Sequence, residues 1–93
     1  MKRYIVRTTV KATESNQSFR GQTAIYYYGK GNRCIGACGS HPKALHTEQA
    51  IRPYEVNEYG YTRKCDAVRS WIYKNPQNDE HWQTTVDIVE IEI

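Results

Sequence analysis

The residues with the most chemical potential lie in one short stretch that contains two thiols and two imidazoles. Cys34, Cys38, His41 and His46 follow one another at intervals of a few residues. Thiolates and imidazoles are the usual ligands of tetrahedral Zn²⁺, and Cys65 could replace one of them. However, the gap between the first two cysteines differs from that of a common zinc knuckle, and no second metal-binding half follows. We therefore expect small buried thiols beside surface histidines, with a small zinc-binding domain as an alternative.

The same stretch contains the groups of a nucleophilic catalyst. Cys38 with His41 or His46 would form a thiolate and base pair. Glu48 or Asp66 could orient the imidazole. Proximity in the sequence does not bring these groups within hydrogen-bond reach, and a chain of 93 residues has little room for a deep substrate pocket. We expect no enzyme activity and no cofactor.

Charge is distributed unevenly along the chain. Residues 1–47 contain eight Lys or Arg and one acid, whereas residues 75–93 contain five acids and no Lys or Arg. The middle is nearly balanced, and the formal net charge is +3. Such asymmetry either joins the two ends of the fold or marks one face for an anionic partner.

The first interpretation pairs the first and last strands. Arg3, Arg7 and Lys11 recur at every fourth position and share the expected outer face of the first strand. The last strand contributes three acids, Asp87, Glu90 and Glu92. If some of these residues lie opposite each other, each cross-strand pair contributes about 0.2–1 kcal/mol. The charges would then set the strand register.

The second interpretation is a docking surface of loop cations and tyrosines. Tyr26 and Tyr28 lie between cations that a distant acidic strand cannot all neutralise, namely Arg20, Lys30 and Arg33. Arg and Tyr are favoured at protein interfaces, and cations with aromatic rings also suit phosphates and bases. We expect these five residues to bind a protein or a protein–nucleic acid complex. The alternative is direct binding of nucleic acid or a nucleotide.

Alternating side chains predict the strands of a sheet. Residues 3–12 and 22–29 alternate and form a natural hairpin, and residues 33–37 could return as a third strand. Residues 81–93 form the last strand, in which the apolar phase shifts at Ile88-Val89. The shift indicates a bulge there, or a last stretch that is buried on both faces.

Apolar residues at i, i+3 and i+7 predict a helix over 63–74, which Pro76 ends. A second, shorter helix is expected over 42–51. We expect residues 54–62 to form a small hairpin or an ordered loop.

These elements predict a two-layer α+β fold, in which an antiparallel sheet of three to five strands packs on one face against helix 63–74. Residues 1–93 are expected to form a single domain. Eight Ile and six Val against one Leu suit a sheet-based core. No apolar run approaches the roughly 20 residues that span a bilayer, and an odd number of cysteines argues against a secreted disulfide framework. We therefore expect a cytoplasmic protein, whose exposed sheet edge could extend into a homodimer.

In general character the chain resembles the small accessory proteins of phages and mobile elements, because it is compact, contains eight Tyr and has no catalytic signature. Some of those proteins inhibit host nucleases such as CRISPR effectors. The resemblance implies a non-catalytic protein that docks on a macromolecular partner as an inhibitor of a nucleic-acid-handling complex. It assigns no residue to the interface.

Overall fold

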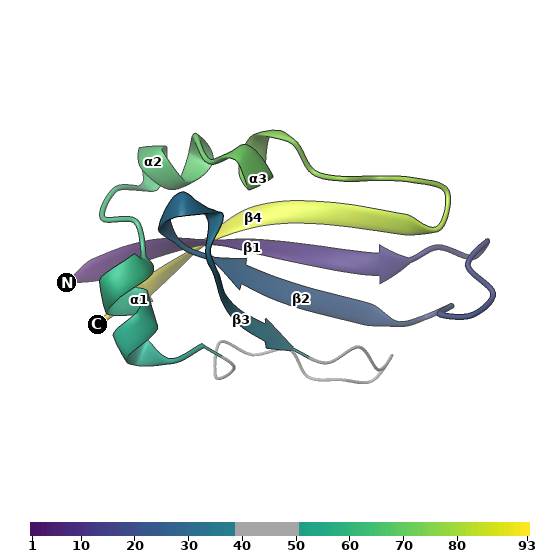
Figure 1. Ribbon diagram of the computed structural model, residues 1–93, viewed down its shortest axis with the longest axis horizontal. Helices are drawn as coiled ribbons and strands as arrows, with labels where there is room; N and C mark the ends of the chain where they lie inside the picture. Colours follow the sequence, from purple (N-terminus) through teal and green to yellow (C-terminus); the bar gives the residue numbers. More distant parts are fainter. Residues whose placement is uncertain (39–50) are drawn as a thin grey trace.

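The computed structural model describes residues 1–38 and 51–93. Its strands form one antiparallel sheet of four strands in the order β3-β2-β1-β4 (Figure 1). The strands are β1 (Lys2–Ala12), β2 (Thr23–Tyr28), β3 (Cys34–Cys38) and β4 (Trp82–Glu92). Together with three α-helices, this sheet confirms the expected α+β fold and all four predicted strands.

The pairing of β1 with β4 is continuous. Lys2 to Ala12 lie opposite Glu92 to Trp82, one to one, so these two strands contain no bulge. Ile88 and Val89 are both half-buried and point to opposite faces of the sheet. The expected burial on both faces does not continue to the end of the strand, because Glu90 and Glu92 are exposed. The described sheet has its irregularity between β2 and β3, at Tyr27 and Tyr28.

The helices are divided between the two faces of the sheet, whereas one covered face was expected. We call the face that carries Ile5 the α1 face, because α1 (Pro53–Tyr59) packs there. The opposite face, which carries Val6, is the α3 face. It is covered by α2 (Lys64–Val68) and α3 (Trp71–Lys74), which lie on the other side of the strands from α1 (Figure 1).

The main hydrophobic core lies on the α1 face. Its buried members come from three strands, from α1 and from the chain two residues before α1: Ile5, Ile25, Tyr27, Ile35, Ile51 and Val56. Val89 and Ile91 of β4 pack against them. The face of β1 that carries Arg3 and Arg7 is therefore not an outer face, because α1 covers it at Ile5, which is fully buried.

Helix α1 occupies the stretch expected to form a hairpin or loop. Pro53 stands at the start of the helix, where its missing N–H costs no hydrogen bond. Gly60 ends the helix by donating its backbone N–H to the carbonyl oxygen of Val56 at 2.8 Å. Tyr61 and Tyr4 then exchange two backbone hydrogen bonds of 2.8 Å, which join the end of α1 to β1.

The helix predicted for 63–74 is interrupted at Ser70. This residue is extended, with φ −61° and ψ 152°, and its hydroxyl accepts a hydrogen bond from the backbone N–H of Tyr73. Serine is a favoured N-cap because its side chain satisfies an orphan N–H of the following helix. The sequence therefore begins a new helix, α3, where the apolar spacing alone predicts continuation.

The short helix expected over 42–51 falls almost entirely in residues 39–50, outside the described part of the chain. Within the described part, no helix combines the length and the apolar character needed to cross a membrane.

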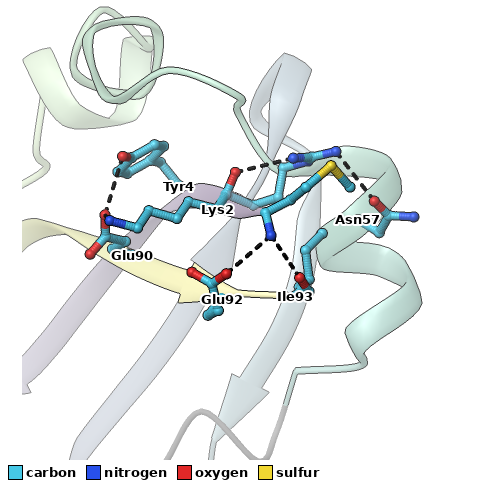
Figure 2. Close-up of polar contacts among 8 residues, drawn as sticks. Lys2, Tyr4, Asn57, Glu90, Glu92 and Ile93 are labelled. Carbon is cyan, nitrogen blue, oxygen red and sulfur yellow. Dashed lines mark hydrogen bonds and ion pairs between the residues drawn. The ribbon is translucent and has the colours of Figure 1, made fainter.

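The charges of β1 and β4 pair across the strands. Arg7 forms a hydrogen-bonded ion pair with Asp87, which lies directly opposite it. On the other face, Lys2 Nζ lies 3.4 Å from Glu90 Oε1, and the N-terminal ammonium lies 3.0 Å from Glu92 Oε1 (Figure 2). The uneven charge distribution therefore helps to join the two ends of the fold.

Arg3 and Lys11 do not share in this pairing. They lie on the α1 face, whereas strict alternation places Glu90 and Glu92 on the α3 face. Arg3 instead donates to the Lys2 carbonyl oxygen at 3.1 Å and to Asn57 Oδ1 at 3.3 Å (Figure 2). Of the three cations expected on this face of β1, Arg7 alone pairs with an acid of β4 in the described structure.

Candidate docking groove

A groove runs along the α3 face of the sheet, from the β1–β2 loop to α3. It consists of two depressions of about 470 and 200 Å³, which share Val10, Tyr26, Gln77 and Thr84. Strand register builds its floor, because Thr8 lies opposite Tyr26 on one side and Val86 on the other. Since side chains alternate along a strand, these residues share one face of the sheet.

Aromatic rings mark both ends of the groove. At the loop end, the rings of Phe19 and Trp82 lie with their centroids 5.6 Å apart. At the helix end, Trp71 lines the groove beside Ile72. Phe19 is 47% exposed and Trp71 is 53% exposed, so both offer aromatic surface to a ligand.

The β1–β2 loop is anchored in a way that positions Phe19. Asn16 is buried, its amide donates to the His81 carbonyl oxygen at 3.1 Å, and its Oδ1 accepts from the Phe19 N–H at 3.1 Å. Thr13 also donates to the carbonyl oxygen of Glu80 at 2.6 Å. These hydrogen bonds hold the loop against the segment that precedes β4.

The segment between α3 and β4 forms one wall of the groove. Asp79 Oδ1 accepts from the backbone N–H groups of His81 and Trp82 at 2.8 and 2.9 Å. Asn78 Oδ1 accepts from the N–H of Thr84 at 2.7 Å. The side chains of Asp79 and Asn78 thus fix both this wall and the start of β4.

The groove is nearly uncharged. None of the described residues that line it is Lys or Arg. Its one carboxylate, that of Asp79, accepts backbone hydrogen bonds. Burial, and secondarily the neighbouring Cys34, raises the pKa of Tyr28 above the ordinary phenol value, so this hydroxyl is neutral at physiological pH. The groove therefore offers aromatic surface with neutral hydrogen-bonding groups.

The structure brings together two of the five residues predicted to bind a partner. Tyr26 and Tyr28 line the groove. Arg20 follows Phe19 in the β1–β2 loop, whereas Lys30 and Arg33 lie beyond the opposite end of β2, in and after the short 3-10 helix η1 (Lys30–Asn32) (Figure 1). Because β2 spans six residues, about 20 Å at roughly 3.3 Å per residue, Arg20 lies far from Lys30 and Arg33, and the five predicted residues do not form one compact patch.

The three cations are nevertheless not neutralised by carboxylates of the described residues. Within residues 1–38 and 51–93, Arg20, Lys30 and Arg33 form no ion pair with an acid. The Arg33 guanidinium lies over the ring of Tyr59, 4.3 Å from its centroid. Arg20 and Lys30 are exposed and lie beyond opposite ends of β2.

Three aromatic residues of the groove were missing from the predicted site: Phe19, Trp71 and Trp82. The alternation of Trp82 with Thr84 and Val86 did predict that they share one face of a strand. Only the register with β1 shows that this face is the one that carries Tyr26. Phe19 had one sequence signal, a large aromatic residue in an otherwise polar loop.

The zinc hypothesis stays a prediction. Cys34 and Cys65 are exposed free thiols. The Cys38 side chain, His41 and His46 lie outside the part of the chain whose side chains are described. A search of the described residues finds no group of three or more potential metal ligands.

Comparison of the chain with protein-family models, with curated proteins and with solved structures finds no match.

Proposed function

We propose that this protein is a non-catalytic interaction protein that holds a segment of a protein partner in the groove of the α3 face. The observation that carries the proposal is the pair of exposed aromatic side chains, Phe19 and Trp71, at the two ends of a groove floored by Tyr26. Tyr and Trp are enriched among the residues that dominate protein-binding energy. Aromatic-lined grooves also recur in the recognition of extended peptides.

Charge favours a polypeptide over a nucleic acid as the occupant. Binding of nucleic acid depends on Lys and Arg that neutralise phosphates, and the described lining of the groove contains neither. Arg20 and Lys30, which have no acidic partner among the described residues, are not part of the groove lining and lie beyond opposite ends of β2. They would contact the flanks of a bound partner, where charge affects association rate more than affinity.

Docking on a nucleic-acid-handling complex, with inhibition as its result, is the role that the general character of the chain implies. It remains a prediction about the identity of the partner. The groove itself supports the coarser proposal, a polypeptide as occupant.

The proposal is tested by selecting peptides from a displayed random library on the wild-type protein and measuring their affinity for variants. We expect the selected peptides to bind Phe19→Ala or Trp71→Ala at least about tenfold more weakly, which corresponds to about 1.4 kcal/mol. Both side chains are half-exposed, so their truncation should leave the fold intact. Tyr54→Ala is the matched control, because Tyr54 is a 61% exposed aromatic residue on α1, away from the groove.

Selected peptides that bind Trp71→Ala and Phe19→Ala as tightly as wild type would contradict the proposal, as would a selection that enriches none. Binding of an oligothymidylate provides the competing result. If it is tight, falls steeply with salt and is weakened by Trp71→Ala, the groove binds nucleic acid and the alternative function replaces ours.

A further inference from the structure

The outer edge of β4 has backbone groups that point away from the sheet. Alternate residues of an antiparallel strand direct both their backbone groups to the same side. The N–H of Ile93 donates to the Met1 carbonyl oxygen at 2.8 Å, so the odd-numbered residues of β4 face β1. The even-numbered residues face outward. Consistent with this, Trp82 and Thr84 bond to Asp79 and Asn78 on the wall of the groove.

Beyond Thr84, this edge is free in the described structure. β4 is the last strand of the sheet. The outward N–H and C=O groups of Val86, Ile88, Glu90 and Glu92 have no hydrogen-bond partner among the described residues. A strand edge of this kind is a template for pairing with another strand.

Charge does not block such pairing, although the segment carries three acids. Each acid is already held by a cation of β1 or by the N-terminus. Asp87 pairs with Arg7. Glu90 pairs with Lys2, and Glu92 pairs with the N-terminal ammonium (Figure 2). The edge therefore presents carboxylates whose charge is largely compensated within the same molecule.

We propose that the partner of this edge is the β4 edge of a second copy of the chain. The two strands would run antiparallel about a two-fold axis at Val89, so that the even-numbered residues exchange backbone hydrogen bonds in pairs. Val86 then lies opposite Glu92 of the second copy, and Ile88 lies opposite Glu90. In this register the free segment 86–92 pairs over its whole length with the same segment of the second copy.

Neighbouring registers are disfavoured. A two-fold axis at Asp87 or at Glu90 would place two identical carboxylates opposite each other, which is destabilising. A centre at Ile88 pairs Glu92 with Thr84, whose N–H is already bonded to Asn78. The register centred on Val89 avoids both conflicts and places each acid opposite an apolar residue.

The first test compares Glu90→Pro with Glu90→Ala by analytical ultracentrifugation. Proline at position 90 removes an outward N–H and no hydrogen bond to β1. Alanine removes the same side chain and keeps the N–H. We expect wild type and Glu90→Ala to sediment at twice the 10.8 kDa chain mass. Glu90→Pro should be monomeric, with an unchanged far-ultraviolet circular dichroism spectrum.

A second test does not depend on the proline variant folding. In a background with the native cysteines replaced by serine, Val89→Cys should oxidise to a covalent dimer. Thiols at a non-hydrogen-bonded pair lie within disulfide distance. Thr85→Cys lies on the same face of β4 but off the axis and should stay monomeric. A wild-type monomer at millimolar concentration would overturn the proposal, and so would equal cross-linking of the two cysteine variants.

Discussion

At the residue scale, Gly60 shows how closely the end of α1 approaches the rest of the molecule. A Cβ atom at this position would lie 2.4 Å from the carbonyl oxygen of Val56 and 3.0 Å from Arg3 Cβ. The first contact is with backbone, which cannot move away as a flexible side chain can. We expect Gly60→Ala to lower the free energy of unfolding by about 1–3 kcal/mol, the usual cost of overpacking, as measured by urea denaturation.

The control for this prediction is Glu58→Ala. Glu58 is exposed on the same helix, and alanine favours a helix, so this variant should differ from wild type by less than about 0.5 kcal/mol. An equal loss in both variants would show that α1 is sensitive to any change, and the steric explanation for Gly60 would fail.

Individual groove residues were predictable only in part. Alternation along β2 placed Tyr26 and Tyr28 on one face, as observed. Arg20 lies at the other end of β2 from Lys30 and Arg33, because the six-residue strand carries the chain about 20 Å between them. The shared face of Tyr26 and Tyr28 was therefore predictable, whereas the binding role of the five residues stays a prediction.

At the scale of elements, strands were easier to predict than helices. Two-residue alternation is strict, so β1 and β4 could be read from the sequence almost to their ends. Helix α1 was missed because residues 57–60 have the composition of a turn. Its signal was Pro53 in the first turn and Gly60 after the last, the usual asymmetry of helix ends.

The break between α2 and α3 leads to a test of Ser70. The Ser70 hydroxyl caps α3 through the N–H of Tyr73, and an isolated helix as short as α3 has little stability of its own. We expect Ser70→Ala to lower the free energy of unfolding by about 1 kcal/mol, the usual cost of a lost N-cap. Thermal and urea denaturation measure this change.

Ser70→Thr tests the cause, because threonine keeps a capping hydroxyl. It should retain more stability than Ser70→Ala. If Ser70→Thr loses at least as much stability as Ser70→Ala, the buried volume of this side chain matters and its hydrogen bond does not. A stable Ser70→Ala variant with a continuous helix over 63–74 would contradict the capping role directly.

At the scale of the whole molecule, the two faces of the sheet differ in what they carry. The α1 face holds the main core, whereas the α3 face carries the groove. Pairing of two β4 edges about a two-fold axis would place both grooves on the same side of one extended sheet. A partner with two matching segments could then bind both copies, which raises affinity without any new contact.

The stability of the whole molecule should depend on pH in the alkaline range. Burial raises the pKa of Tyr28 and of Tyr61 above the ordinary value of about 10. The unfolded chain then loses these protons first, so the free energy of unfolding is unaffected below about pH 10 and falls as pH rises above it. Urea denaturation on either side of about pH 10 measures the fall. A Tyr28→Phe/Tyr61→Phe variant should lose less stability over this range, and an equal loss in both proteins would exclude these phenols as the cause.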